Sequence, residues 1–493
     1  MRSAILARWI PTAVVAVAAS GGGCVVGGGG DPVFSSVEGE NKTGQEVAKL
    51  IEEQVGLVDD PALAHYLRAV GDRLASHARR PGVAYHFDVV NMEDPNAFAL
   101  PGGYVYLSRG LLALVNSEDE LANVVGHEIG HVVDRHYAKR KARSAPFLPV
   151  RLATGIGGAL AGIVSPMLGG AIAGAGELSS GLVLAPYSRS QETKADEIGQ
   201  KLAAESGWNP AGISTFMHTL SREQELAGQD PDRVSFLSTH PASPERSTRT
   251  AERAQTLTPA RRAPIAKSHA DFLHRLDGLL VGPSAKEGVF DGRNFLHPEL
   301  GFALVFPEGW ETANSPRVVG ASAPGGDAVV VLALVAEGDD PVQAAQAYRA
   351  KSSARVSEPQ RMRVGGLQAA RAELRTGGFF SRHAAEITWI AYGGRIYQIT
   401  GASSEGRFDA LRPAFGAVAK SFHPLQPAER RTIREDRLRL VAARAGETLA
   451  QVVERSGCRW TPEQAAVANG VRVGSRYDTG ALVKITRAEH YRP

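Results

Sequence analysis

The sequence predicts a multidomain protein with a mainly α-helical domain that contains a small β-sheet, then an α+β sandwich domain, then a small terminal module. The chain has 493 residues, which is more than one hydrophobic core usually accommodates. Apolar residues recur mostly at helical spacing over 45–282, whereas 290–426 is rich in strand-like apolar runs. A charged linker, 426–437, is expected before the terminal module, 438–487.

Composition is that of an ordinary globular protein. The chain is 43% hydrophobic and 22% charged, close to typical values. Its formal net charge of +3 gives no sign of the basic face that nucleic-acid binding requires, so we expect no nucleic-acid partner. The two cysteines, Cys24 and Cys458, are too few for a zinc–thiolate site or a disulfide framework.

The first 24 residues have the pattern of an export signal. Arg2 and Arg8 form a basic start before an uncharged apolar stretch, 9–19, and small residues follow that stretch. This pattern is typical of a secretory signal peptide, so we expect an exported, periplasmic protein. Cys24 is similar in position to the acylated cysteine of lipoproteins and is a lipidation candidate for an outer-membrane anchor, with ordinary cleavage nearby as the alternative. A glycine-rich linker, 25–44, follows.

The helical domain is expected to start with two helices and two strands. Apolar residues at helical spacing between 45 and 78 are interrupted near Pro61, which predicts two helices. Residues 83–92 alternate like a strand, and 103–107 form a second apolar run.

The next helix is predicted from Ser117 to about Lys141. Ser117 and Glu120 form a capping box, and basic residues lie at the far end. The sequence HEIGH, 127–131, therefore lies within a helix and presents both histidines on one face. His136 is expected to face solvent.

Two histidines at this spacing suit a catalytic zinc ion, which takes three protein ligands and keeps one position open. Glu128 lies beside them and can take a proton from a metal-activated water. The metzincin pattern is excluded as the source of the third ligand, because its glycine and histidine positions hold Asp134 and Tyr137.

A later helix, 188–205, offers the missing ligand. Its capping pair and a closing glycine and proline define the helix. Glu192 and Asp196 are four residues apart, so one carboxylate can bind the metal while the other orients a ligand histidine. A solvated acidic pair is the alternative. The uncharged stretch before this helix, 152–176, is interrupted by Pro166 and is predicted as a helical hairpin or lid.

The sandwich domain, 290–426, carries strand-like runs with a hairpin turn at Gly393-Gly394 and two expected helices, near 341–349 and 407–421. The sequences FPEGW and SFHPL near its ends resemble a PsbP/Mog-type sandwich. No catalytic constellation is visible in it.

Four motifs in order resemble the zinc metallopeptidases of the HtpX and CAAX-prenyl-protease type, especially the secreted bacterial BepA-like branch. They are NAFALPGG (96–103), HEIGH (127–131), ETKAD (192–196) and THPASPER (239–246). The resemblance covers about 40–280 and implies a zincin-type (gluzincin) peptidase fold with one zinc ion per chain.

The resemblance also implies a role for each motif residue. His127, His131 and Glu192 would bind zinc, Glu128 would be the general base and Asp196 would support a ligand. His240 would lie beside the zinc, either stabilising the developing oxyanion or capping the metal in a latent state, and Arg246 would fix its loop. Asn96, Ala97 and Phe98 would line the substrate cleft, and the strand after that motif would pair with an extended peptide.

Residues 438–487 resemble a divergent LysM module with βααβ order, on the sequences AGETL, NG and GALVKI. That family binds N-acetylglucosamine chains, so peptidoglycan is a candidate partner; a module that only packs is the alternative. The leading hypothesis is an exported zinc endopeptidase that cleaves misfolded or unassembled envelope proteins. A latent chaperone-like protein gated by His240 and a peptidoglycan amide hydrolase are the alternatives.

Overall fold

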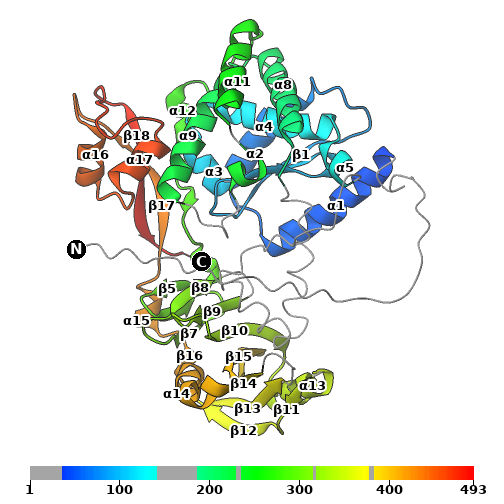
Figure 1. Ribbon diagram of the computed structural model, residues 1–493. Coiled ribbons are helices and arrows are strands. Elements are labelled where there is room, and N and C mark those ends of the chain that lie inside the picture. The colour runs from blue at the N-terminus through cyan, green and yellow to red at the C-terminus, as the bar shows by residue number, and fades with distance from the viewer. Residues whose placement is uncertain are drawn as a thin grey trace.

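The structure is a computed structural model that describes residues 36–141, 186–228, 235–241, 243–314, 318–352, 354–376 and 382–492. It contains a mainly helical domain, a sandwich domain and a C-terminal β-α-α-β module, which lies against the helical domain (Figure 1). The signal segment, Cys24 and the stretch 152–176 lie outside the described residues.

Two helices open the helical domain. Helix α1 spans Val37–Gln54 and begins where the Ser36 hydroxyl accepts a hydrogen bond from the Gly39 amide. The predicted linker, 25–44, is therefore wrong over its last residues, because a capping serine starts the helix earlier. Helix α2 spans Pro61–Ala75 with proline in its first turn, which confirms the break expected near Pro61.

A three-stranded sheet follows, in the order β1-β3-β2. Strand β1 spans His86–Val90, β2 spans Ala97–Ala99 and β3 spans Tyr104–Ser108. Strand β3 pairs in parallel with β1 and antiparallel with β2. The strand after NAFALPGG is therefore central and paired on both sides, so the expectation that it pairs with a peptide is wrong. The outer strand next to it is β2, which sequence analysis missed because it has only three residues.

Eight helices make up the rest of the described helical domain. They are α3 (Arg109–Leu114), α4 (Glu118–Val133), α5 (His136–Lys141), α8 (Arg189–Glu205), α9 (Gly212–Ala227), α10 (Phe236–Thr239), α11 (Pro244–Thr256) and α12 (His269–His274). The single helix predicted over 117–141 is wrong. Arg135 adopts a φ of 57°, which no α-helix accommodates, so α4 ends before it and α5 starts after it.

Helices α4 and α8 approach closely because small residues face each other. A Cβ atom added to Gly199 of α8 would lie 2.6 Å from the amide nitrogen of His127, and one added to Gly130 of α4 would lie 2.8 Å from the carbonyl oxygen of Ala195. Only glycine permits this separation. The first turns of α8 are thereby held against the histidine face of α4.

The sandwich domain is built on an eight-stranded sheet whose main path runs β11-β13-β14-β15-β10-β9-β8, with β12 paired to β13, and on a small sheet in the order β16-β7-β6-β5. The strands are β5 (Val289–Asp291), β6 (Asn294–His297), β7 (Phe302–Val305), β8 (Glu311–Asn314), β9 (Val318–Ser322), β10 (Ala328–Glu337), β11 (Arg355–Val356), β12 (Gln360–Val364), β13 (Leu367–Thr376), β14 (His383–Tyr392), β15 (Arg395–Ser404) and β16 (His423–Pro424).

Two helices cover opposite sides of the large sheet. Helix α13, Pro341–Lys351, packs Ala345 into one apolar cluster, while α14, Glu405–Ser421, packs Phe408 and Phe415 into another. Gly393 and Gly394 have positive φ and form the β14–β15 hairpin, as the sequence predicts.

The C-terminal module consists of β17 (Arg434–Ala442), α16 (Leu449–Ser456), α17 (Pro462–Ala468) and β18 (Leu482–His490). The linker predicted over 426–437 is wrong, because α15 spans Pro427–Arg430 and β17 starts at Arg434. Its βααβ order agrees with the expectation, while the relation to LysM stays a prediction. Among the described residues no helix is both long and apolar enough to cross a membrane.

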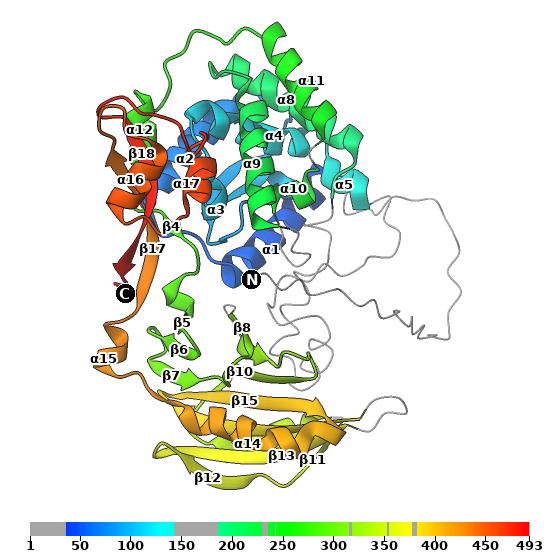
Figure 2. The same cartoon turned by 60° about the vertical axis from the view of Figure 1, so that its left-hand side comes forward.

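This module is attached to the helical domain by strand pairing and by a buried lysine. Strand β17 pairs antiparallel with β4, Leu280–Val281, of the helical domain. Lys484 Nζ of β18 donates to the carbonyl oxygens of Ala113, at 2.8 Å, and Val115, at 2.9 Å. Figure 2 shows α16 and α17 beside the helices of the first domain, with the sandwich domain below.

Candidate metal centre

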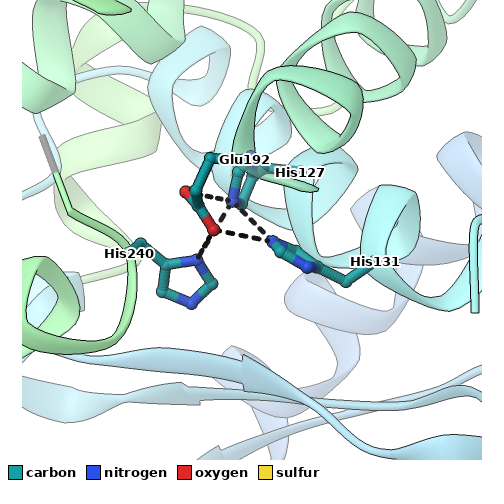
Figure 3. Close-up of side chains that lie close together, drawn as sticks. All are labelled: His127, His131, Glu192 and His240. Carbon is teal, nitrogen blue, oxygen red and sulfur yellow. Dashed lines mark hydrogen bonds and ion pairs between the residues drawn. The ribbon is translucent and has the colours of Figure 1, made fainter. Parts of the chain in front are cut away.

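Three elements bring the predicted metal-binding residues together. Helix α4 supplies His127 and His131, the first turn of α8 supplies Glu192, and His240 follows α10. One ligand atom from each of the four lies within 4.8 Å of the others, and all four side chains are buried. Figure 3 shows the four side chains pointing toward one another.

The separations suit a single zinc ion. His131 Nε2 lies 3.0 Å from His127 Nε2, which is 3.2 Å from His240 Nδ1. Glu192 Oε1 lies 3.1 Å from His240 Nδ1 and 3.4 Å from His131 Nε2. A tetrahedral zinc site with bonds of about 2.0–2.1 Å places its ligand atoms roughly 3.3 Å apart. The donor set of histidine nitrogens and one carboxylate therefore fits zinc in both chemistry and spacing.

Burial and neighbouring charges favour the metal-binding protonation states of His131 and Glu192. Burial lowers the pKa of His131 well below its usual value, which favours the neutral ring. Burial acts to raise the pKa of Glu192, but His240 and His127 hold that pKa well below the usual range. A neutral imidazole and an ionised carboxylate are the forms that bind a metal ion.

His127 is oriented by a carboxylate from α8. Its Nδ1 lies 2.9 Å from Asp196 Oδ1. Arg246 binds the same carboxylate through two nitrogens, each at 2.8 Å, and lies 2.5 Å from Glu192 Oε2. Its Nη1 also donates to the carbonyl oxygens of His240, at 3.3 Å, and Pro241, at 3.2 Å. One guanidinium thus links both α8 carboxylates to the segment that carries His240.

Glu128 lies at the side of this cluster. It is fully buried, and neither carboxylate oxygen has a hydrogen-bond partner among the described residues. Burial raises its pKa, partly opposed by His240 and His127. His240 Nε2 lies 3.5 Å from Glu128 Oε1. Such an unsatisfied buried carboxylate is costly and is most readily explained by a catalytic role.

The residues expected to line the substrate cleft lie at β2 and are buried. Asn96 and Ala97 have 0% exposed surface and Phe98 has 5%. The backbone next to them is joined to the His240 segment, because the Phe236 amide donates to the Pro95 carbonyl at 2.7 Å. The Phe236 ring in turn stacks on His240, with centroids 4.3 Å apart.

The prediction that His136 faces solvent is wrong. The residue is 1% exposed, and its Nδ1 lies 2.9 Å from His131 Nδ1. The expectation assumed a continuous helix, in which residue 136 lies on another face. No local sequence signal indicated the backbone reversal at Arg135, because a positive φ is uncommon for arginine.

The comparisons with known proteins agree with this geometry. Residues 61–254 match the model of Peptidase family M48. A beta-barrel assembly-enhancing protease of Yersinia pestis is 30% identical over 270 residues, which cover 54% of this chain and 52% of that protein. The mitochondrial metalloendopeptidase OMA1 of Schizosaccharomyces pombe is 29% identical over 214 residues, covering 43% of this chain and 60% of that protein.

The similarity is confined to part of each protein. The chain spans about half the length of the beta-barrel assembly-enhancing proteases it matches. The solution structure of cyanobacterial PsbP (CyanoP) from Synechocystis sp. PCC 6803 matches 29% of this chain and 98% of that chain, with 16% identity and a TM-score of 0.22. That score supports no fold assignment for the sandwich domain. Residues 61–254 are therefore similar to the peptidases of family M48, and this part of the chain contains the buried ligand group that could hold one metal ion.

Proposed function

We propose that this protein is an exported zinc-dependent endopeptidase that hydrolyses peptide bonds in misfolded or unassembled envelope proteins. The observation that carries the proposal is the placement of Glu128 beside four clustered ligand atoms, buried and without a hydrogen-bond partner in the part of the chain that the structure describes. No structural metal site needs such a carboxylate, whereas hydrolysis needs a base next to the metal.

In this proposal His127, His131 and Glu192 hold the ion. Zinc would supply Lewis acidity that makes water a nucleophile at neutral pH and polarises the scissile carbonyl. Glu128 takes the proton from the attacking water and then delivers it to the leaving amine. The raised pKa of Glu128 suits this exchange, because a buried carboxyl group holds a proton more readily than a solvated one.

His240 has two candidate roles that the same geometry supports. Its Nε2 lies near Glu128, where an N–H could donate to the oxyanion that develops on the substrate. Its Nδ1, however, lies within 3.2 Å of both His127 Nε2 and Glu192 Oε1, where it can act as a fourth metal ligand. A protein in which His240 also held the ion would be latent until His240 moved away from His127 and Glu192.

The substrate class and the location rest on similarity and on the signal-like N-terminus. The relatives named beta-barrel assembly-enhancing proteases support protein substrates of the bacterial envelope and a periplasmic site of action. We propose Cys24 as a lipid-attachment residue at the outer membrane. The C-terminal module is proposed as the part that binds peptidoglycan glycan chains.

Zinc content and casein cleavage test the central proposal. The purified full chain is expected to contain one zinc ion and to cleave casein, and chelation should abolish cleavage. If His240 holds the site latent, His240→Ala should raise cleavage; if His240 stabilises the oxyanion, the same variant should lower it. A protein that binds no zinc contradicts the proposed activity.

A further inference from the structure

The ring nitrogen of His131 that faces away from the metal-binding cluster is held by a second histidine. His131 Nδ1 lies 2.9 Å from His136 Nδ1, and His136 Nε2 lies 2.7 Å from Asp134 Oδ2. Lys139 Nζ lies 2.6 Å from the same carboxylate oxygen. Both histidines are buried, with 2% and 1% of their surface exposed, so water does not replace the contact between the two rings.

These distances determine where each proton lies. Two imidazole nitrogens at hydrogen-bond distance share one proton, since two N–H groups or two lone pairs would repel. A neutral histidine that offers Nε2 to a metal carries its proton on Nδ1. With a metal ion at His131 Nε2, His131 would therefore donate from Nδ1, and His136 would accept at Nδ1 and donate from Nε2 to Asp134. Each ring N–H in the series from His131 through His136 to Asp134 then meets one acceptor.

We propose that Asp134 and His136 are positioning residues for the metal ligand His131. They fix its tautomer and the plane of its ring, so that the Nε2 lone pair points into the cluster. This inference rests on the proposed function, because it assigns a metal ion to that cluster. It concerns residues outside the H-E-x-x-H motif, and His136 contacts Nδ1 of His131 rather than the Nε2 that faces the cluster.

The backbone supports this role. In a continuous helix, a residue five positions after His131 would project about 140° away from it around the helix axis. Helix α4 instead ends at Val133, and Arg135 takes a φ of 57°. The chain reverses there and returns the His136 ring to His131. A non-glycine residue with positive φ costs free energy, which is explained when the turn positions a functional side chain.

The two ligand histidines of α4 are thus supported in different ways. His127 Nδ1 contacts the buried carboxylate of Asp196 directly. Asp134 lies at the helix end with 29% of its side chain exposed. It therefore acts on His131 only through a ring that lies between them. His136 supplies that ring. Partners of this kind typically change metal affinity by about 10- to 100-fold when removed.

Zinc affinity of the full chain tests the proposal, measured by competition with a chromogenic chelator using zinc alone. His136→Leu removes the acceptor and should weaken zinc binding about 10- to 100-fold. In His136→Asn the side-chain oxygen falls near the position of Nδ1 and can accept from His131, so this variant should retain most of the affinity. Asp134→Asn keeps an acceptor but removes its charge, so its zinc affinity should lie between those of His136→Leu and His136→Asn.

A matched control is His297→Leu in β6 of the sandwich domain, whose partly buried ring accepts from the Leu300 amide. Its zinc affinity should equal that of the wild type. Unchanged affinity in both His136→Leu and Asp134→Asn, each with a wild-type circular dichroism spectrum, overturns the positioning role. The positioning role is also overturned if His136→Leu and His136→Asn lose zinc affinity equally. A wild-type protein that binds no zinc instead overturns the proposed function.

Discussion

The helical domain and the sandwich domain bury polar side chains in different ways. In the sandwich domain they pair locally: the Trp389 indole of β14 donates to Gln398 of β15 at 3.0 Å, and Gln398 donates to Thr400 of the same strand at 3.1 Å. In the helical domain, ionisable side chains converge on one point, and Glu128 keeps both oxygens unsatisfied among the described residues. Because burying charge is costly, this convergence indicates a site that binds something, whereas local pairing indicates a core.

The helix packing of the two regions differs as well. Helices α4 and α8 touch backbone to backbone at Gly126, Gly130 and Gly199. Helix α14 of the sandwich domain covers its sheet with phenylalanine side chains, and Gly406 near its start has open space around it. Glycine backbones therefore hold α4 against α8, whereas side chains lie between α14 and its sheet.

The largest effect is expected for Glu128→Gln. The substitution preserves size but removes the proton acceptor, so casein cleavage should fall by about 10²- to 10⁴-fold while zinc stays bound. The matched control is Glu386→Gln in the sandwich domain, a carboxylate buried beside Arg412, which should leave cleavage unchanged. Full cleavage by Glu128→Gln would remove this residue from the mechanism.

Gly199→Ala is expected to have the next largest effect. The new methyl group would meet the His127 backbone at 2.6 Å, so α8 must move away and carry Glu192 with it. Overpacking of this kind costs about 1–3 kcal/mol. Thermal unfolding of the helical domain should occur at lower temperature, and zinc affinity should fall. Unchanged values for both would show that α8 can shift without affecting the cluster.

Lys484→Met should weaken the attachment of the C-terminal module and remove a pH dependence. Burial lowers the pKa of Lys484 to about 7. The folded protein therefore holds this proton less tightly than the unfolded chain, so the lysine contributes stability above its usual pKa that declines as pH falls toward 7. The variant also leaves two carbonyl groups without a donor, at a cost of about 1–3 kcal/mol.

Amide hydrogen exchange in β17 and β18 between pH 7 and pH 10 measures this effect, after correction for the intrinsic exchange rate. Protection should increase with pH in the wild type and change less in the variant. If protection in the wild type and in Lys484→Met changed equally with pH, the effect would belong to a group other than Lys484.

The smallest effect is expected for Gly406→Ala, the same substitution as Gly199→Ala but in the other region. This exposed helical position has no neighbour within 4 Å of an added Cβ atom. Replacing glycine in a helix by alanine should stabilise the sandwich domain by roughly 0.5–1 kcal/mol. Calorimetry that resolves the unfolding of the two domains should show destabilisation by Gly199→Ala and stabilisation by Gly406→Ala. A destabilised Gly406→Ala protein would contradict the contrast between the regions.

Local patterns predicted much of the site and the order of its elements. The capping residues Ser117 and Ser188 placed α4 and α8 correctly at their starts, because capping uses side chains within one helical turn. The contacts that complete the site could not be predicted in this way. The reversal at Arg135, the outer position of β2 and the pairing of β17 with β4 each depend on residues distant in the chain or on an uncommon backbone angle.

The pairing of β17 with β4 has a consequence for how the core of the helical domain is completed. Leu438, Val467 and Ala468 belong to the same apolar cluster as helices α2 and α4. The sandwich domain separates these residues from the helical domain in the sequence, so the core of the helical domain is complete only when the C-terminal module packs against it. Removal of the chain from β17 onward would therefore uncover part of the core that supports the metal-binding cluster.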